Sequence, residues 1–185
     1  MRNVEIKVQA PDLERVEALL RAIPGVRDAG LLQQRDIFLP SAAGRLKLRF
    51  QDARPAQLIR YERADEARLR TSEYQIFDID NGEAFLAVAE RAWGPQPEVR
   101  KRRRLFWVDN IRVHLDEVEG LGSFVELEAI VDAAHDVTTC HAGAERLLRL
   151  LELDTSPPES RAYVDLLACI RDDAGGKPHV ADEDV

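Results

Sequence analysis

The stretch NIRVHLDEVEGLGSFVELEAIV, residues 110–131, predicts two strands joined by a turn at Gly120-Leu121-Gly122. Successive side chains of a strand point to opposite faces, so each predicted strand has one ionisable face and one apolar face. A lone hairpin of this kind is typical of a half-solvated surface sheet, so the pattern elsewhere in the chain decides how it is used. The ionisable faces carry Arg112, His114 and Asp116 in the first strand and Glu126 and Glu128 in the second.

Other segments repeat this alternation of ionic and apolar side chains. The predicted strand 3–9 places Glu5 and Lys7 on one face. The predicted strand 45–50 places three cations on one face, Arg45, Lys47 and Arg49. Three like charges at this spacing repel one another unless anions lie between them. Further strands are predicted at residues 31–39, 57–63, 70–79 and 98–108.

Two cationic segments leave the orientation of their side chains open. Arg60 and Arg63 fall on opposite faces of the strand 57–63, so at most one of them points at any given site. In the strand 98–108, apolar residues occur on both faces, so alternation alone does not decide which cations lie inside. Lys101 and Arg103 share one face, and Arg100, Arg102 and Arg104 share the other.

The remaining patterns predict four helices and a single domain. Apolar residues at helical spacing predict helices over 12–23, 83–93, 135–151 and 160–170. Ser160 is expected to cap the last of these. No repeat or domain-splitting linker is evident, so residues 1–173 are predicted to form one α+β domain. Residues 174–185 are polar and acidic, and are predicted to be disordered.

Composition excludes some classes of partner. The 185 residues carry a net charge of −8, which argues against general nucleic-acid binding because that requires a basic footprint. No apolar run approaches membrane-spanning length, and no signal peptide is evident, so a cytoplasmic location is expected. Cys140 and Cys169 lack the spacing of a metal site and are predicted to be reduced thiols. The expected partner is a small molecule, and self-association into a homodimer is compatible with the sequence.

The ionic faces can be used in two ways. If they all point outward, the inner faces form an ordinary apolar core. If the sheet closes into a barrel with the ionic faces inward, it encloses a polar tunnel, and every buried charge then requires a partner. A polyanion with a divalent cation would supply partners for both signs, because Lys and Arg bind phosphate oxygens and carboxylates bind Mg²⁺ or Mn²⁺.

The sequence resembles the CYTH superfamily, which is named for class IV adenylate cyclase and thiamine triphosphatase. Asn3-Val4-Glu5-Ile6-Lys7 resembles the family's E-x-E-x-K motif, although Asn3 replaces its first glutamate. Asn can bind a cation through its carbonyl oxygen but brings no negative charge. The other matching segments are Gly44–Arg49, Leu58–Arg63, Val99–Arg103, Asp109–Glu119 and Phe124–Glu128.

The resemblance implies an eight-stranded antiparallel closed β-barrel, a triphosphate tunnel, with flanking α-helices. It implies Mg²⁺ or Mn²⁺ as the cofactor, and an acidic ligand is expected at either His114 or Asp116, of which carboxylate chemistry favours Asp116. The implied metal ligands are Glu5, Asp116, Glu126 and Glu128. The implied phosphate-binding residues are Lys7, Lys47, Arg49, Arg60, Arg63, Lys101, Arg103 and Arg112.

Three functions fit such a tunnel. The first is a phosphohydrolase that releases orthophosphate from tripolyphosphate, a nucleoside triphosphate or thiamine triphosphate, and it is slightly favoured because inorganic triphosphate makes the fewest demands on the site. The second is a class IV-type adenylate cyclase that converts ATP to cyclic AMP and pyrophosphate. The third is a non-catalytic polyphosphate- or nucleotide-binding protein, for which Asn3 is the motivating residue. The sequence contains no recognisable adenine-reading motif that would choose between them.

Overall fold

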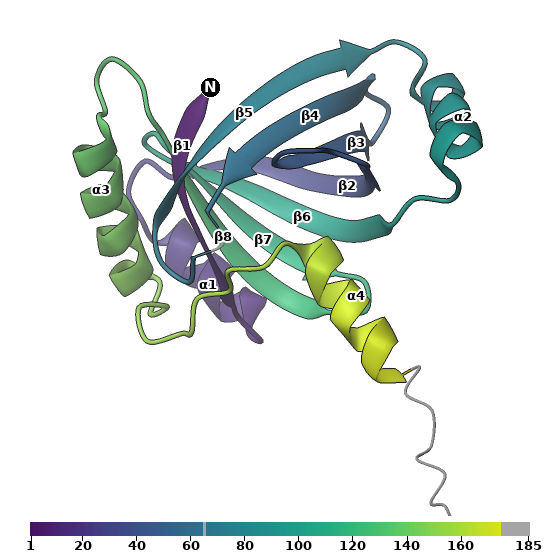
Figure 1. Ribbon diagram of the computed structural model, residues 1–185. Coiled ribbons are helices and arrows are strands. Elements are labelled where there is room, and N and C mark those ends of the chain that lie inside the picture. The colour runs from purple at the N-terminus through teal and green to yellow at the C-terminus, as the bar shows by residue number, and fades with distance from the viewer. Residues whose placement is uncertain (65, 175–185) are drawn as a thin grey trace, which may run out of the picture.

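The chain folds into a closed antiparallel barrel of eight strands, which confirms the predicted fold class (Figure 1). The computed structural model describes residues 1–64 and 66–174. Around the barrel the strands follow the order β1-β5-β4-β3-β2-β6-β7-β8. The strands are β1 (Arg2–Gln9), β2 (Arg27–Leu39), β3 (Arg45–Gln51), β4 (Ala56–Arg63), β5 (Arg70–Ile79), β6 (Glu98–Val108), β7 (Ile111–Val118) and β8 (Gly122–Ile130).

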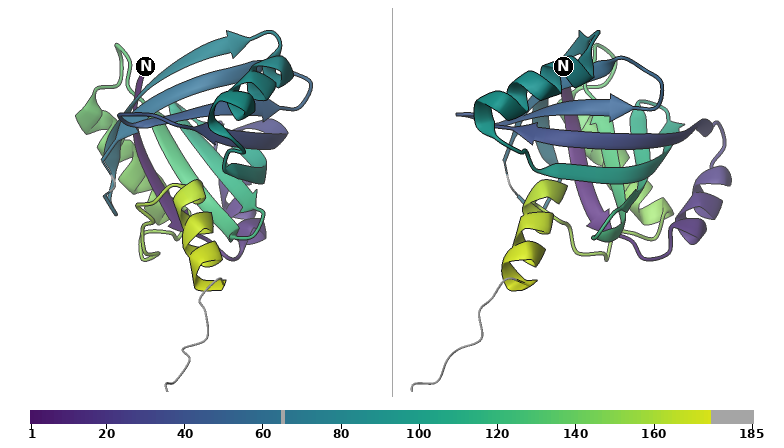
Figure 2. Two further views of the ribbon diagram at one scale, coloured as in Figure 1. Left: turned by 45° about the vertical axis from the view of Figure 1, so that its right-hand side comes forward. Right: turned by 90° about the vertical axis from the view of Figure 1, so that its right-hand side faces the viewer.

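The four helices lie outside the barrel wall (Figures 1 and 2). They are α1 (Leu13–Arg21), α2 (Gly82–Trp93), α3 (Val137–Leu150) and α4 (Tyr163–Ala174). Helices α1 and α3 pack beside β1, β7 and β8, whereas α2 covers β3 at the opposite side. No helix in the described part of the chain is long and apolar enough to cross a membrane.

The apolar core lies between the barrel wall and the helices rather than inside the barrel. Val4, Ile6 and Val8 on β1 pack with Leu20 of α1 and Leu147 of α3. The alternate residues of the same strand, which point into the barrel, are buried as well. Both faces of β1 are therefore buried, which confirms the inward arrangement of ionic faces. Fully burying one such aliphatic side chain contributes ~1.5–3 kcal/mol, so this outer core offsets the cost of a polar interior.

Several element boundaries differ from the prediction. Strand β2 begins at Arg27, four residues before the predicted start, and passes through a register shift between Asp28 and Gly30. Helix α3 begins at Val137 because Asp136 caps it by accepting a hydrogen bond from the backbone of Thr139 at 2.7 Å.

The prediction that Ser160 caps the last helix is wrong. Helix α4 begins only at Tyr163, and the Asp165 carboxylate accepts a hydrogen bond from the Ala162 backbone at 3.1 Å at its start. The backbone that precedes helix α4 contacts the barrel, since Arg63 of β4 donates to the Ser160 carbonyl at 3.2 Å. Of the segment predicted to be disordered, residues 175–185 lie outside the described residues.

Candidate functional site

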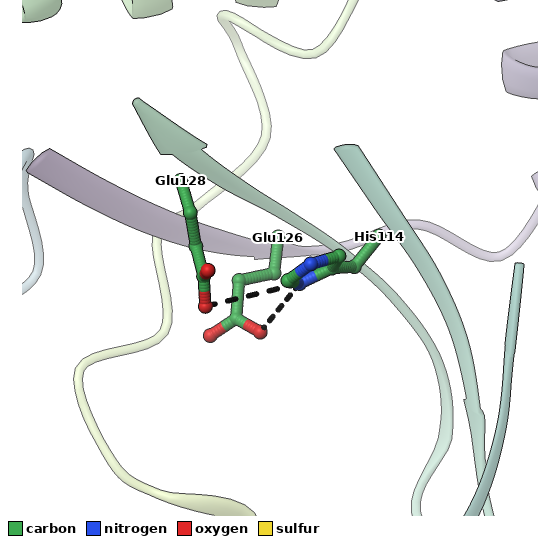
Figure 3. Close-up of side chains that lie close together, drawn as sticks. All are labelled: His114, Glu126 and Glu128. Carbon is green, nitrogen blue, oxygen red and sulfur yellow. Dashed lines mark hydrogen bonds and ion pairs between the residues drawn. The ribbon is translucent and has the colours of Figure 1, made fainter. Parts of the chain in front are cut away.

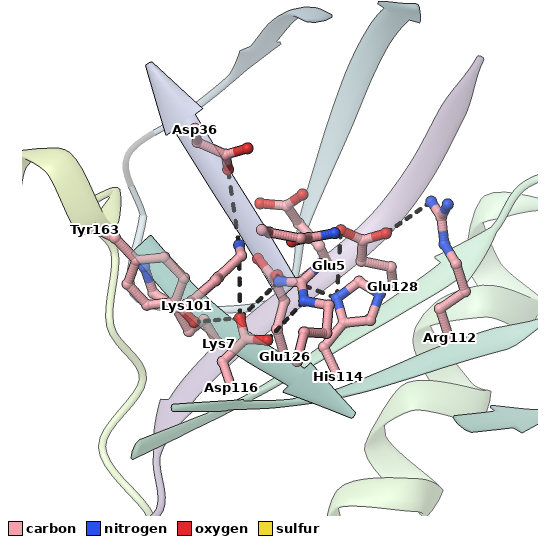
Figure 4. A network of polar contacts seen from close by, with 12 residues as sticks. Glu5, Lys7, Asp36, Lys101, Arg112, His114, Asp116, Glu126, Glu128 and Tyr163 are labelled. Carbon is pink, nitrogen blue, oxygen red and sulfur yellow. Dashed lines mark hydrogen bonds and ion pairs between the residues drawn. The ribbon is translucent and has the colours of Figure 1, made fainter. Parts of the chain in front are cut away.

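The barrel encloses a cavity of about 340 Å³ with a strongly ionic lining (Figure 4). In the described part of the chain, eight cationic side chains line it against four carboxylates. The cavity is therefore net positive although the chain as a whole carries −8. Such a cavity attracts anions more strongly than the overall charge indicates. The cations are Lys7, Lys47, Arg49, Arg54, Arg63, Lys101, Arg103 and Arg112, and the carboxylates belong to Glu5, Asp36, Glu126 and Glu128.

Strand register explains why residues distant in sequence meet here. In an antiparallel pair, directly opposed side chains have their Cβ atoms about 4.5–5.5 Å apart. The register between β7 and β8 sets His114 opposite Glu126 and Arg112 opposite Glu128. The register between β6 and β7 sets Arg103 opposite Asp116, and that between β1 and β8 sets Lys7 opposite Glu126 and Glu5 opposite Glu128.

His114, Glu126 and Glu128 form a cluster that could hold a cation (Figure 3). His114 Nδ1 lies 3.2 Å from Glu126 Oε2 and 3.9 Å from Glu128 Oε1. Burial lowers the pKa of His114, with Arg103 adding to the effect, so its imidazole is neutral at neutral pH. Without a cation, Nδ1–H donates to Glu126, and transfer of this proton to Nε2 leaves a lone pair on Nδ1 for a ligand bond. Burial alone would raise the carboxylate pKa values, but a hydrogen bond from His114 and nearby Arg103 lower the pKa of Glu126, and Arg112 lowers that of Glu128.

Asp116, the ligand favoured from the sequence, lies outside the cluster of His114, Glu126 and Glu128. Asp116 is fully buried, and both of its oxygens are already occupied. Arg103 donates to Oδ1 and Oδ2 at 2.6 Å each, and the Tyr163 hydroxyl donates to Oδ2 at 2.9 Å. Burial alone would raise the pKa of Asp116, yet Arg103 and Lys101 lower it to about 2. His114, not Asp116, faces the cavity beside the two glutamates.

Glu5, expected as a ligand, lies in the cavity but outside the three-residue cluster. Its carboxylate accepts a hydrogen bond from Arg70 at 3.2 Å and lies 3.4 Å from Arg63. Burial, with Glu126 nearby, raises the pKa of Glu5 to about 8 in spite of the cations. Without a bound cation the side chain is therefore largely protonated at neutral pH.

Lys47 and Arg49 share the carboxylate of Asp36, which the sequence reasoning missed. Arg49 donates to Asp36 at 2.6 and 2.8 Å, and Lys47 donates at 2.9 Å. Burial, with Arg49 nearby, lowers the pKa of Lys47 to about 7. Polar residues at alternate positions of the strand, Gln34 and Asp36, were the available signal for an inward face on β2.

The structure resolves both orientations left open by alternation. Lys101 and Arg103 line the cavity, with side chains only 3% and 5% exposed, whereas Arg100 and Arg102 are more than half exposed. On β4, Arg63 lines the cavity. Arg60 does not, because its side chain is 41% exposed and pairs with Glu62 at 3.0 Å. The expectation that Arg60 contributes to the site is therefore corrected by its outward orientation.

Arg112 and Lys7, both expected to bind phosphate, also line the cavity. Arg112 binds Glu128 at 2.7 Å and donates to the Tyr74 hydroxyl at 3.3 Å. Lys7 Nζ donates to the Arg161 carbonyl, and burial lowers its pKa to about 8.

Tyr163, at the start of α4, also belongs to the site, although no pattern in the sequence indicated it. Its hydroxyl donates to Asp116. The centre of its ring lies 4.2 Å from Lys7 Nζ and 5.1 Å from Lys101 Nζ. Its placement depends on how residues 158–163 return to the barrel, where the Glu159 backbone donates to the Lys7 carbonyl at 2.8 Å. Local patterns cannot reveal such a long-range contact.

A family model for the CYTH domain matches residues 1–163. The chain belongs to the CYTH family. Enzymes of this family are in general metal-dependent and act on triphosphates, which agrees with the cation-lined cavity and its carboxylate cluster. No curated protein matches this sequence.

Solved structures similar to this CYTH domain share its fold. A conserved hypothetical protein from Pyrococcus furiosus is 23% identical, with a TM-score of 0.76 over 89% of this chain and 99% of that one. A Vibrio parahaemolyticus protein named for a proposed adenylate cyclase activity is 22% identical, with a TM-score of 0.68 over 90% and 97%. The S. pombe RNA triphosphatase Pct1 is 10% identical, with a TM-score of 0.51 over 92% and 83%. At these identities the similarity shows the fold alone.

Proposed function

We propose that the cavity binds a triphosphate-bearing small molecule with a divalent cation, Mg²⁺ or Mn²⁺, and hydrolyses it with release of orthophosphate. The observation that carries this proposal is the arrangement of charge in one enclosed space. Eight cationic side chains of the described residues line the cavity, and a cluster of two carboxylates and an imidazole lies among them on β7 and β8. The cationic side chains can bind the oxygens of a phosphate chain, and the carboxylate and imidazole cluster can bind the cation that the chain carries.

Lys47, Arg49 and Arg103 are the residues proposed to hold phosphate oxygens. In the structure their charges are compensated by Asp36 and Asp116, which also fix their positions. Donors that are held in place before the substrate arrives stabilise developing negative charge without a reorganisation cost. Arg can also bind two phosphate oxygens at once.

Glu126, Glu128 and His114 are proposed to hold the cation, and their oxygen and nitrogen donors fit a divalent ion. When bound, such a cation neutralises phosphate charge and lowers the pKa of an attacking water. Arg103 and Arg112 contact the two glutamates at 2.9 and 2.7 Å and keep their carboxylates directed at this point of the cavity.

An adenylate cyclase is the second candidate. It requires room for a nucleoside, because the ribose 3′-hydroxyl attacks the α-phosphorus and pyrophosphate leaves. Leu32, Ile76 and Leu105 give the cavity an apolar part, and the register sets Leu105 opposite His114. An apolar surface beside the cation cluster suits a base or another flat ring. The fold shared with the Vibrio parahaemolyticus protein is compatible with this alternative.

A non-catalytic polyphosphate or nucleotide binder is the third candidate, and it rests on Asn3. This residue is 3% exposed, and its neutral amide stands where the family motif has a carboxylate. The cytoplasmic location and the homodimer predicted from the sequence also remain proposals, which cell fractionation and light scattering would test.

Product analysis separates the three candidates. The purified chain is incubated with tripolyphosphate, ATP or thiamine triphosphate and either Mg²⁺ or Mn²⁺, and products are resolved by ³¹P NMR and chromatography. Orthophosphate supports the hydrolase, and cyclic AMP with pyrophosphate selects the cyclase. Tight binding without turnover leaves the binder, and neither binding nor turnover with any triphosphate refutes the proposal.

A further inference from the structure

The cation cluster contains one nitrogen donor, His114, beside the two carboxylates of Glu126 and Glu128. We infer that His114 is a direct ligand of the bound cation and makes the site select a first-row transition ion such as Mn²⁺ over Mg²⁺. This inference rests on the proposed function only in assuming that the cluster of His114, Glu126 and Glu128 holds a divalent cation.

The geometry of the cluster suits direct ligation by the imidazole. Bonds of 2.0–2.1 Å at right angles place neighbouring ligand atoms about 3 Å apart. His114 Nδ1 lies 3.2 Å from Glu126 Oε2 and 3.9 Å from Glu128 Oε1, and donor atoms of all three residues lie within 4.8 Å of one another. Only small side-chain movements would bring the three donors around one ion.

The orientation of the ring argues against a purely structural histidine. Nδ1 faces both glutamates, as Figure 3 shows, rather than one acceptor alone. Glu126 Oε2 already accepts a hydrogen bond from Arg103 at 2.9 Å, so it does not depend on His114 for a partner. The side chain is also 5% exposed, which leaves the cavity as the place where its nitrogen can act.

Asn3 supplies an independent observation that points to a ligand. It is 3% exposed, lines the same cavity, and its Oδ1 has no hydrogen-bond partner among the described residues. It lies on β1 two residues before Glu5, which the register sets opposite Glu128. A buried carbonyl oxygen left unsatisfied is costly, and a bound cation or its water would remove that cost.

The chemistry of these donors disfavours Mg²⁺. Mg²⁺ prefers hard oxygen ligands and depends on their charge. Here one of the three clustered donors is an imidazole, and Asn3 offers a neutral amide where the family motif has a glutamate. Divalent first-row transition ions bind imidazole more readily and rise in affinity from Mn²⁺ to Cu²⁺ at such mixed sites. The imidazole donor therefore favours Mn²⁺ over Mg²⁺ at this cluster.

The test uses the full chain, stripped with a chelator and loaded with Mn²⁺ alone. Pulsed electron paramagnetic resonance detects a histidine nitrogen bound directly to Mn²⁺, and ¹⁵N-histidine labelling of the wild-type chain changes that signal without any substitution. We expect the nitrogen coupling in wild type and in the control His141→Gln on α3, and its loss in His114→Asp. We also expect that displacing Mn²⁺ from His114→Asp requires an excess of Mg²⁺ about tenfold or more smaller than the excess that wild type requires.

The outcomes separate this inference from the proposed function. Bound Mn²⁺ without nitrogen coupling in wild type would overturn the inference, even if the protein hydrolyses triphosphates. Nitrogen coupling that persists in His114→Asp would overturn it too. Histidine coupling lost in that variant would support the inference even if product analysis detected no triphosphate turnover, a result that would count only against the proposed function.

Discussion

The guanidinium of Arg103 binds both carboxylate oxygens of Asp116, with Nε–Oδ1 and Nη2–Oδ2 distances of 2.6 Å. Bidentate pairs of this kind are among the strongest polar contacts in proteins. Arg103 also contacts Glu126 at 2.9 Å, so one guanidinium connects the phosphate-binding part of the cavity to the cation cluster. We therefore propose that Asp116 positions Arg103 rather than binding the cation.

Asp116→Asn should destabilise the fold without weakening cation binding. Removing one charge of a buried pair costs about 3–5 kcal/mol, and the remaining contact of Arg103 with Glu126 places the expected loss near the lower end. Urea denaturation measures the loss, and Mn²⁺ titration of the folded variant measures the affinity. A variant of unchanged stability that binds Mn²⁺ far more weakly would make Asp116 a ligand after all.

The same pair gives a pH dependence of stability. Because the pKa of Asp116 is lowered to about 2 in the folded chain, from an ordinary value of 3.8, its contribution is fully present above pH 4. The contribution is lost as pH falls from 4 towards 2. Denaturation curves of wild type and Asp116→Asn should therefore converge over this interval, and a constant difference down to pH 2 would contradict the assignment.

Lys47→Met should weaken binding of a non-hydrolysable imido analogue of tripolyphosphate. A hydrogen bond to a charged group contributes about 1.5–3 kcal/mol, which corresponds to roughly 10- to 150-fold in affinity. Arg60→Met is the matched control, since Arg60 points away from the cavity. The affinity of this variant for the analogue should stay within about twofold of the wild-type affinity. Calorimetric titrations that show equal effects of the two substitutions would place the phosphate chain elsewhere.

Binding of the same analogue should take up a proton at pH 8. Burial lowers the pKa of Lys47 to about 7, so this amine is mostly neutral at pH 8 in the free protein and is charged again beside bound phosphate. Affinity should accordingly fall as pH rises from 7 to 9. Binding heats in buffers of different ionisation enthalpy measure the uptake, and an uptake no smaller in Lys47→Met would assign the proton to another group.

Asn3→Glu should make the stability of the protein more dependent on the cation. A new buried carboxylate near Glu5 and Glu128 lacks a partner, so the melting temperature without metal should fall by ~4–8 °C, equivalent to about 2 kcal/mol. Added Mn²⁺ should raise the melting temperature of Asn3→Glu by more than it raises that of the wild-type protein. Equal metal-induced shifts in the two proteins would show that residue 3 lies outside the cation site.

The strands could be predicted because they follow from alternation along the chain. The convergence of their ionic faces was expected from the resemblance to the CYTH family, since alternation left inward and outward arrangements open. The boundaries of β5 and β6 are as predicted, and the turn between β7 and β8 spans residues 119–121, one residue earlier than predicted. Alternation could not tell which face of β6 lies inside, since cations occur on both. Barrel closure makes that choice, and it directs Lys101 and Arg103 inward.

The rest of the site depends on partners that are remote in sequence. Asp36 was missed because the alternating Gln34 and Asp36 indicate a polar face on β2 but give no local sign that two cations of β3 will share the carboxylate. Asp116 was favoured as a ligand on carboxylate chemistry, and its bidentate pairing was not foreseen because Arg103 lies on a neighbouring strand. Tyr163 reaches the cavity only through the path of residues 158–163, which no periodicity specifies.

The most direct test is a crystal structure of the full chain with Mn²⁺ and the imido analogue of tripolyphosphate. We expect an anomalous manganese peak between His114, Glu126 and Glu128, and phosphate oxygens on Lys47, Arg49 and Arg103. A phosphate chain bound at the exposed Arg100 and Arg102 outside the barrel, with the cavity empty, would contradict the account.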